Sequence, residues 1–424
     1  MPLPLAKRDF DVFLSHAHKD KQFVKELDCW LTEKAGLRVW FDGRELGGGA
    51  LLATDLQAAI ERCRGALVVA SEESIERGWV KSEYNAAMNE RANDEGFRVI
   101  TLKLGAANTD SLMKGLTWID LPEARLDADA ATEILRALYP GERLPQPATA
   151  RDVYVSCSWR TDDGESARAV CRSLAAQGFR LIGDARDQQG FGQGDRVQRI
   201  IESCGAFVCV LPHRGVDTVA ADVAEYKYFV KEIDFAVQCG LPCIIVADPR
   251  LQRSDGDDSR WRRLATDATR CPAEIESALA ALWDDWQVPR RPQYVFCAMD
   301  LSSPMAAAGS QERHLIERIT GMPTVVGTEI QSDALHSAIM QQICEAFVVF
   351  ADISDDNVNS CIEAGMGLAA GTNVKLISSG RMRNPPFMLR GAGQLASYAD
   401  AAERIGVLHK LLRPFRRRVI NAEL

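Results

Sequence analysis

Short runs of aliphatic and β-branched residues alternate with amphipathic stretches along this chain of 424 residues. In the first third, the apolar runs predict strands at Asp11–Ser15, Leu37–Phe41, Ala66–Ala70 and Phe97–Leu102. Between these runs, apolar residues at helical spacing predict helices at Phe23–Leu31 and Leu56–Cys63. Strands and helices that alternate in this way are typical of a parallel sheet with helices on both faces. We therefore expect an α/β fold.

Two proline-containing segments interrupt the pattern and predict domain boundaries. The first, Pro140–Pro147, holds three prolines and a glycine, which suit neither a helix nor a strand. The second, Val288–Pro292, has two prolines around two arginines. The breaks predict three domains, at residues 1–143, 150–288 and 292–424.

The predicted domains share short sequence patterns in the same order. Asp11–Ser15 has a counterpart in Asp152–Ser156, and Gly36–Asp42 has one in Gly178–Asp184. The apolar strand that follows is repeated a third time at Ile343–Val349. Short strands can converge on such strings, but agreement at successive positions favours tandem homologous domains over chance.

Composition and charge narrow the classes of function. Hydrophobic residues make up 46% and charged residues 26% of the chain, as in a soluble globular protein. The formal net charge of −9 gives no electrostatic support for general nucleic-acid binding. One local basic cluster, formed by Arg413 and residues 416–418, is interpreted as the solvated face of a terminal helix.

Cysteine spacing and hydropathy point to a cytoplasmic protein. The twelve cysteines are scattered singly, as reduced thiols are, and lack the paired spacing of a structural zinc site. We therefore predict no metal site. No apolar run approaches the ~20 residues of a membrane span, and the first ten residues lack the apolar core of a signal peptide. We expect no contact with a membrane.

Five segments of the first third, taken in order, resemble the motifs of Toll/interleukin-1 receptor (TIR) domains. Asp11–Asp20 is similar to the first box, Gly36–Asp42 to the second strand, and Gly43–Gly49 to the mobile loop that follows it. Ser71–Ser74 and Trp79–Glu83 resemble the serine-rich turn and the W-x-x-x-E helix start of NAD-cleaving members. The resemblance implies a flavodoxin-like fold. Together with the repeats, it predicts tandem flavodoxin-like parallel-sheet domains of the TIR or Rossmann-like type.

The same resemblance implies that Glu83 is a catalytic carboxylate and that NAD is the substrate, with no cofactor. Nicotinamide is already a cationic leaving group in NAD, so its release needs no general acid. A single carboxylate can stabilise the oxocarbenium-like transition state at the ribose. From its position alone, Glu83 is better explained as a surface residue in the first turn of a helix, where a carboxylate suits the helix dipole, and it is the ordered resemblance that favours catalysis.

Six further residues are candidates for substrate binding: Ser15, His16, Asp42, Arg44, Ser74 and Trp79. Ser15 and His16 follow a strand at its carboxyl end, where α/β sheets bind ligands, although His16 also suits an ordinary loop histidine. Trp79 is either a wall for nicotinamide or a core aromatic residue. Asp42 and Arg44 either pair with one another or contact the substrate.

The second predicted domain keeps an aromatic-x-x-x-Glu element, Tyr228–Glu232, where the first has Trp79 and Glu83. Glu232 is therefore a candidate for a second active site. Against this, the entry loop Cys157–Asp163 departs from the first box, and an inserted stretch precedes the helix. We interpret this domain as a degenerate TIR-like fold used for packing or ligand binding.

The third predicted domain has Asn359 followed by Glu363 and Gly365, which resembles the N-x-x-x-E-x-G pattern of nucleoside deoxyribosyltransferase-like folds. The alternative is that this segment is a helix that binds a regulatory nucleotide or only packs against the rest of its domain. Two such units behind an effector domain also resemble the SAVED and CARF sensor domains of bacterial anti-phage proteins, which bind cyclic oligonucleotides. This domain is therefore expected to be either deoxyribosyltransferase-like or a sensor.

These observations predict an NAD glycohydrolase that serves as a bacterial anti-phage effector. Its TIR domains would assemble into a homo-oligomer or filament when a linear or cyclic nucleotide occupies the C-terminal region. Two alternatives stay open. One is a TIR scaffold that signals by association without catalysis, and the other is a cyclase that makes a cyclic ADP-ribose messenger through the same glutamate.

Overall fold

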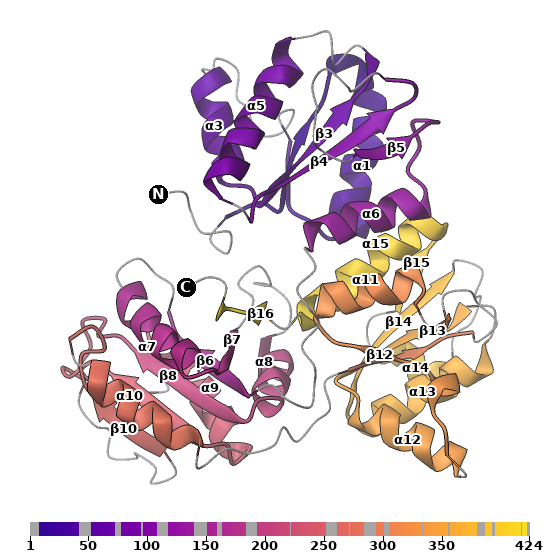
Figure 1. Ribbon diagram of the computed structural model, residues 1–424. Coiled ribbons are helices and arrows are strands. Elements are labelled where there is room, and N and C mark those ends of the chain that lie inside the picture. The colour runs from indigo at the N-terminus through magenta and orange to yellow at the C-terminus, as the bar shows by residue number, and fades with distance from the viewer. Residues whose placement is uncertain are drawn as a thin grey trace. The chain divides into compact units, whose positions relative to one another are not determined.

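A computed structural model (Figure 1) describes the greater part of the chain. The described residues are 8–41, 52–72, 78–94, 96–107, 118–139, 151–158, 163–183, 193–220, 222–251, 261–270, 272–283, 294–300, 306–307, 309–332, 334–354, 357–379, 386–391, 395–416 and 418–421. They divide into two compact units: residues 1–144, 295–344 and 348–414 form one, and residues 145–294, 345–347 and 415–424 form the other. No helix in these described ranges combines the length and the apolar character needed to cross a membrane.

The first sheet, in the first unit, has five parallel strands in the order β2-β1-β3-β4-β5. The strands are β1 (Val12–Ser15), β2 (Val39–Trp40), β3 (Gly65–Ala70), β4 (Arg98–Leu104) and β5 (Trp118–Leu121). The helices are η2 (His18–Asp20), α1 (Lys21–Cys29), η3 (Trp30–Lys34), α3 (Leu52–Glu61), α5 (Gly78–Asn93) and α6 (Ala128–Leu138). Figure 1 shows α3 and α5 side by side along one face of this sheet.

The second sheet belongs to the second unit and has the order β16-β7-β6-β8-β9-β10. Its strands are β6 (Asp152–Ser156), β7 (Arg180–Gly183), β8 (Ala206–Leu211), β9 (Cys243–Ala247), β10 (Trp261–Ala265) and β16 (Arg418–Val419). Its helices are α7 (Gly164–Ala176), α8 (Gln193–Glu202), α9 (Lys227–Gln238), α10 (Pro272–Ala280) and η5 (Ala281–Trp283). The last strand, β16, pairs antiparallel with β7, whereas the other described pairings of the sheet are parallel.

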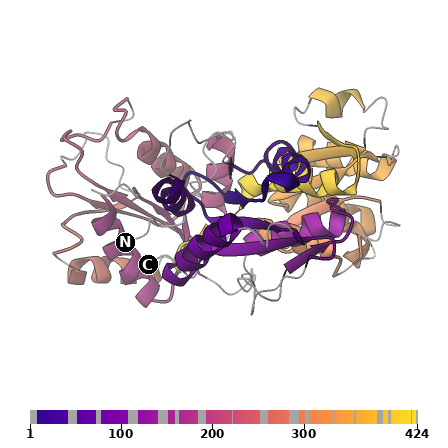
Figure 2. The same ribbon diagram turned by 90° about the horizontal axis from the view of Figure 1, so that it is seen from above.

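The third sheet, again in the first unit, has five parallel strands in the order β12-β11-β13-β14-β15. Its strands are β11 (Val295–Ala298), β12 (Thr324–Val325), β13 (Val348–Asp352), β14 (Asn373–Ser379) and β15 (Leu395–Tyr398). Its helices are α11 (Gln311–Thr320), η7 (Gly327–Glu329), α12 (Leu335–Glu345), α13 (Val358–Ala369), α14 (Phe387–Gly391), α15 (Ala401–Leu412) and η9 (Arg413–Phe415). Each of the three sheets is also seen with its helices from above in Figure 2.

All three sheets contain the same arrangement of five strands, 2-1-3-4-5, which is the flavodoxin-like order. The predicted α/β fold class is therefore confirmed, with β16 as an antiparallel addition that the sequence did not indicate. The predicted domain boundaries at residues 143, 150, 288 and 292 lie outside the described residues and stay predictions. In a fold of this order, ligands bind at the carboxyl ends of the strands, where the strand order reverses.

Helix α15 of the third sheet packs against α6 and η3 of the first sheet within the same unit. The Trp30 indole donates to the carbonyl of Ala402 at 2.9 Å. The buried His409 ring lies between the Tyr139 hydroxyl and the Ala35 carbonyl, at 2.6 Å from each. Since a carbonyl only accepts, Nδ1 of His409 donates to Ala35.

One residue of the terminal basic cluster, Arg413, is buried, although the cluster was predicted to be exposed to solvent. Arg413 is only 4% exposed, and its guanidinium donates to both carboxylate oxygens of Asp11 at 2.7 and 3.1 Å. The interpretation of the cluster as a solvated helix face is therefore wrong for Arg413. A buried guanidinium needs a carboxylate partner, and this partner lies 402 residues away in the sequence.

Candidate active site

Ser15 and Glu83 meet at the carboxyl end of β1. Ser15 is the last residue of β1 and is 1% exposed, and its hydroxyl donates to Oε2 of Glu83. Glu83 lies in the second turn of α5 and is 4% exposed. The alternative in which Glu83 is a surface residue is therefore wrong. The strand end and the helix hold the carboxylate in one orientation.

Two neighbouring strand ends bring further polar groups to the same edge of the sheet. The His16 ring packs on Phe41, which follows β2, with 5.2 Å between the ring centres. Ser71 follows β3, and its hydroxyl donates to Oδ2 of Asp20 at 2.8 Å. Beneath this edge, Phe13 of β1 stacks on Trp40 of β2 in the apolar core, with ring centres 4.8 Å apart. The site therefore rests on a packed base.

The remaining predicted contacts are only partly covered by the structure. Asp42, Arg44 and Ser74 lie outside the described residues. Trp79 belongs to the first turn of α5, four residues before Glu83, and its side chain is outside the description. Residues four apart lie on one face of a helix, which is the arrangement that the W-x-x-x-E resemblance implies. The roles of these four residues stay predictions.

The corresponding edge of the second sheet has different neighbours. Ser156 ends β6 as Ser15 ends β1, and it pairs in register with Cys209, where Ser15 pairs with Val68. Burial raises the pKa of the Cys209 thiol, and the nearby charge of Glu232 raises it further. Glu232 lies in α9, which packs against β8.

Arg214 and Asp163 form a buried ion pair next to this edge, which the sequence did not reveal. Arg214 follows β8 and donates to Oδ2 of Asp163 at 2.7 and 3.1 Å, and the two side chains are 7% and 9% exposed. The guanidinium also lies over the Tyr228 and Phe229 rings, at 5.8 and 5.3 Å from their centres. The only sequence signal was the inserted stretch that contains Arg214. In the second sheet this edge is therefore occupied by a self-neutralised pair.

The third sheet has a buried ionic network at the end of β13, which the sequence also did not reveal. Asp352 accepts from Nε of Arg404 at 3.0 Å and from the Tyr398 hydroxyl at 3.1 Å. Arg404 also pairs with Glu312 of α11 at 2.5 Å. Burial raises the pKa of Glu312, and the charge of Arg404 opposes the shift. This network joins α11 and α15 to the sheet.

The three residues of the deoxyribosyltransferase-like pattern all lie on α13. Asn359 is exposed, whereas Glu363 is partly buried. No group of three or more His, Cys, Asp or Glu side chains in the described ranges is arranged to hold a metal ion.

Comparison with known proteins supports the resemblance of the first domain. Residues 12–136 match the family model described as TIR domain. The chain is 36% identical over 96 residues to the NAD(+) hydrolase TcpA of Theionarchaea archaeon (strain DG-70-1), covering 22% of this chain and 28% of that protein. It is 35% identical over 80 residues to the probable 2' cyclic ADP-D-ribose synthase TcpO of Methanobrevibacter olleyae, covering 19% of this chain and 23% of that protein.

Among solved structures, the TIR domain of the Toll-related receptor TRR-2 from Hydra magnipapillata matches 31% of this chain and 99% of its own, with 16% identity and a TM-score of 0.27. The chain spans about a quarter of the length of the two curated relatives. Residues 12–136, which include Ser15 and Glu83, are a TIR domain, as the ordered motifs predicted.

Proposed function

We propose that the TIR domain at residues 12–136 cleaves the bond between nicotinamide and ribose in NAD, with Glu83 as the catalytic carboxylate. The observation that carries this proposal is the buried pair of Ser15 and Glu83 at the carboxyl end of β1. The relatives named as an NAD(+) hydrolase and as a probable cyclic ADP-ribose synthase support the same substrate.

The chemistry needs one oriented anion. When the glycosidic bond breaks, its electron pair goes to the pyridinium nitrogen and nicotinamide leaves as a neutral molecule. Positive charge then develops on the ribose, and the Glu83 carboxylate stabilises it. Ser15 keeps the carboxylate in place through its hydrogen bond. Attack by water at the ribose carbon, with loss of a proton, gives ADP-ribose.

Five further residues complete the proposed substrate site. His16 lies beside Phe41 at the same sheet edge as Glu83, which supports a contact with the nucleotide. Asp42, Arg44, Ser74 and Trp79 are proposed on the TIR resemblance alone. The buried Arg214–Asp163 ion pair, whose arginine follows β8, favours a structural role for the second sheet, so Glu232 is not proposed as catalytic.

The relatives differ in the product that their names imply, so cyclisation is a second candidate. Both reactions pass through the same cationic ribose and differ in the nucleophile that captures it. Hydrolysis is the preferred form of the proposal, because water needs no group of the protein to fold the substrate back on itself. Detection of a cyclic product would replace hydrolysis with cyclisation as the proposed reaction.

We further propose that the chain is a cytoplasmic anti-phage effector of bacteria, active when its TIR domains associate into an oligomer or filament. A nucleotide that binds the C-terminal region would drive this association. Three sheets of one strand order in a single chain support a division into an effector domain and ligand-binding domains.

The test is product analysis by liquid chromatography and mass spectrometry. Purified full-length protein is incubated with NAD at high protein concentration with a crowding agent, beside the Glu83→Ala variant. We expect equal amounts of nicotinamide and ADP-ribose from the wild type and neither from the variant. A cyclic ADP-ribose product would establish the second candidate, and no nicotinamide under any condition would favour a non-enzymatic TIR scaffold.

A further inference from the structure

The third sheet carries a carboxyl group that the proposed reaction does not use. Glu363 lies in α13, whose inner face packs on the sheet through the buried Ala364 and Gly367. A β-carbon built on Gly327 would lie 3.5 Å from Oε1 of Glu363 and 3.8 Å from Cδ1 of Ile339. The carboxyl therefore faces η7 and α12 at the carboxyl end of β12.

Glu363 has neither a hydrogen bond nor an ion pair with the part of the chain that the structure describes. Burial alone raises its pKa to about 7. One turn earlier on the same helix, Ser360 is fully buried, and its hydroxyl has no hydrogen-bond partner among the described residues. Buried polar groups without partners are rare in native proteins, and a carboxyl with such a pKa is typical of a binding or catalytic site.

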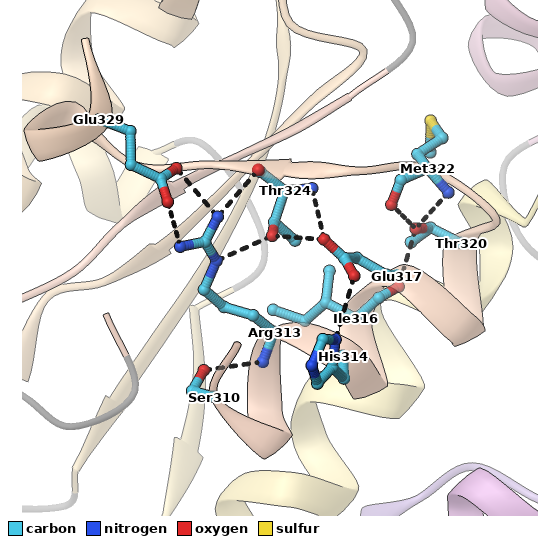
Figure 3. A network of polar contacts seen from close by, with 9 residues as sticks. All are labelled: Ser310, Arg313, His314, Ile316, Glu317, Thr320, Met322, Thr324 and Glu329. Carbon is cyan, nitrogen blue, oxygen red and sulfur yellow. Dashed lines mark hydrogen bonds and ion pairs between the residues drawn. The ribbon is translucent and has the colours of Figure 1, made fainter. Parts of the chain in front are cut away.

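A network of polar contacts flanks the Gly327 turn that faces Glu363, and Figure 3 shows this network around Arg313, Thr324 and Glu329. Arg313 of α11 donates to the two carboxylate oxygens of Glu329 at 2.6 and 2.9 Å, and to the Thr324 hydroxyl at 2.8 Å. These contacts fix the chain on both sides of Gly327. They also neutralise Glu329, so Glu363 is the carboxylate at this turn that can still accept donors from a ligand.

Apolar side chains are exposed on the same two helices. Val358 and Ile362 of α13 are 65% and 50% exposed, and Met340 of α12 is 49% exposed. Small-molecule sites typically combine an apolar lining with a few polar groups that fix the orientation of the ligand. A ligand with a flat apolar part and hydroxyl donors suits this combination.

We propose that Glu363, Ser360 and the Gly327 turn bind the ribose of a nucleoside or nucleotide, whose two adjacent hydroxyls donate to the Glu363 carboxylate. In doubly wound folds, a carboxylate beside the strand ends accepts ribose hydroxyls in this manner. The regulatory role of this site rests on the proposed activation by a nucleotide, whereas binding itself does not depend on NAD cleavage.

The test is isothermal titration calorimetry of the full-length protein with adenosine, ADP-ribose and 2',3'-dideoxyadenosine at pH 6 and pH 8. With a pKa of about 7, the Glu363 carboxyl is ionised in roughly one molecule in ten at pH 6 and nine in ten at pH 8. We therefore expect adenosine to bind about tenfold more tightly at pH 8. Dideoxyadenosine, which lacks both hydroxyls, should not bind. Binding of ADP-ribose alone would identify a nucleotide, and binding of both would identify a nucleoside.

The elements around Glu363 contribute other charged groups, namely Glu329 on η7, His336 and Glu345 on α12, Asp352 on β13 and Lys375 on β14. Glu329 and Asp352 are paired with arginines, and burial lowers the pKa of Lys375. A His336→Gln variant should keep the pH dependence of binding if Glu363 is its source.

Glu363→Gln should weaken binding at least tenfold at pH 8 and remove the pH dependence. Glu274→Gln, an exposed change of the same chemistry, should leave the affinity for adenosine unchanged. The proposal is overturned if the wild type binds neither adenosine nor ADP-ribose, if dideoxyadenosine binds equally well, or if Glu363→Gln binds as the wild type does. Because the assay measures binding, failure here is distinct from failure to release nicotinamide.

Discussion

The first and second sheets are alike at the starts of their strands and different at the ends. At the start of β1, Asp11 accepts a hydrogen bond from the backbone N–H of Arg38 at 2.8 Å. At the start of β6, Asp152 accepts from the Arg180 guanidinium at 2.5 and 2.6 Å. Each aspartate thus ties the first strand of its sheet to the second, at the same place in the repeat.

At the carboxyl ends, the first sheet brings Ser15 to Glu83, whereas the second has Cys209 beside Ser156 and the Arg214–Asp163 pair nearby. The difference teaches that the contacts which both sheets share lie at the starts of their strands, at one edge of each sheet. The groups that can perform chemistry lie at the other edge and can change without loss of the strand order.

The largest expected effect on stability comes from Arg214→Met. This change leaves the buried Asp163 carboxylate without its partner, and it should lower the free energy of unfolding of the second unit by about 3–5 kcal/mol. Chemical denaturation followed by tryptophan fluorescence measures the loss. Nicotinamide release per folded molecule should be unchanged, because the proposed catalytic residues belong to the first sheet.

A matched control is Arg250→Met, which removes an ion pair with Asp248 whose arginine side chain is 65% exposed. Its expected effect on the free energy of unfolding is too small to measure, as for many other solvent-exposed pairs. Equal effects of the two variants would contradict the structural role of the Arg214–Asp163 pair.

Asp11, at the start of β1, should contribute about 2 kcal/mol to the free energy of unfolding, and this contribution should depend on pH. Burial alone would raise the pKa of Asp11, but the charge of Arg413, with those of Arg64 and Arg38, lowers it to about 2. A lowered pKa stabilises the folded state above the unfolded value near 4, and this contribution disappears as the pH falls towards 2. Asp11→Asn should be less stable at pH 7 and lose that step of the acid unfolding curve. If Asp11→Asn unfolds at low pH along the same curve as the wild type, the role given to Asp11 is wrong.

Ser15→Ala should reduce kcat for NAD cleavage by about ten- to a hundredfold, since a hydrogen bond to a charged group contributes roughly 1.5–3 kcal/mol. KM should change little, because the serine holds the carboxylate rather than the substrate. Steady-state kinetics of nicotinamide release measures both constants. Ser156→Ala, at the corresponding position of the second sheet, should leave both unchanged, and an equal loss in that variant would break the comparison.

The smallest expected effect comes from Cys209→Val. Cys209 of the second sheet corresponds to Val68 of the first, so the change makes the two positions identical. The two side chains are close in volume, so the cost should be below about 1.5 kcal/mol. Burial raises the pKa of the thiol, which keeps it protonated and unreactive, so NAD cleavage should not change. A large loss of nicotinamide release would show that the second sheet takes part in the reaction.

Local pattern was sufficient to predict β1 to β4, α1 and α3 around the first sheet, whereas β5 and α6 were not predicted. The predicted strand Ala66–Ala70 is β3 (Gly65–Ala70), and the predicted helix Phe23–Leu31 corresponds to α1 and the start of η3. The ordered motifs also indicated the TIR domain, because hydrophobic period and motif order are both properties of nearby residues.

Contacts between distant residues were not predictable in this way. Asp163 and Arg214 are 51 residues apart, and Asp11 and Arg413 are 402 residues apart. A charged residue in a sequence looks solvated unless its partner is known, so the buried arginines were missed. The pairing of β16 with β7 was missed for the same reason, since two residues carry no strand pattern of their own.

The central claim is that the chemistry belongs to the first sheet and not to the second. The most direct measurement is kcat for nicotinamide release by the wild type, Glu83→Gln and Glu232→Gln at the same high protein concentration. We predict a loss of about 10²–10³-fold in Glu83→Gln, the usual cost of removing a group that stabilises transition-state charge, and no change in Glu232→Gln. Wild-type activity in Glu83→Gln, or an equal loss in Glu232→Gln, would contradict the account.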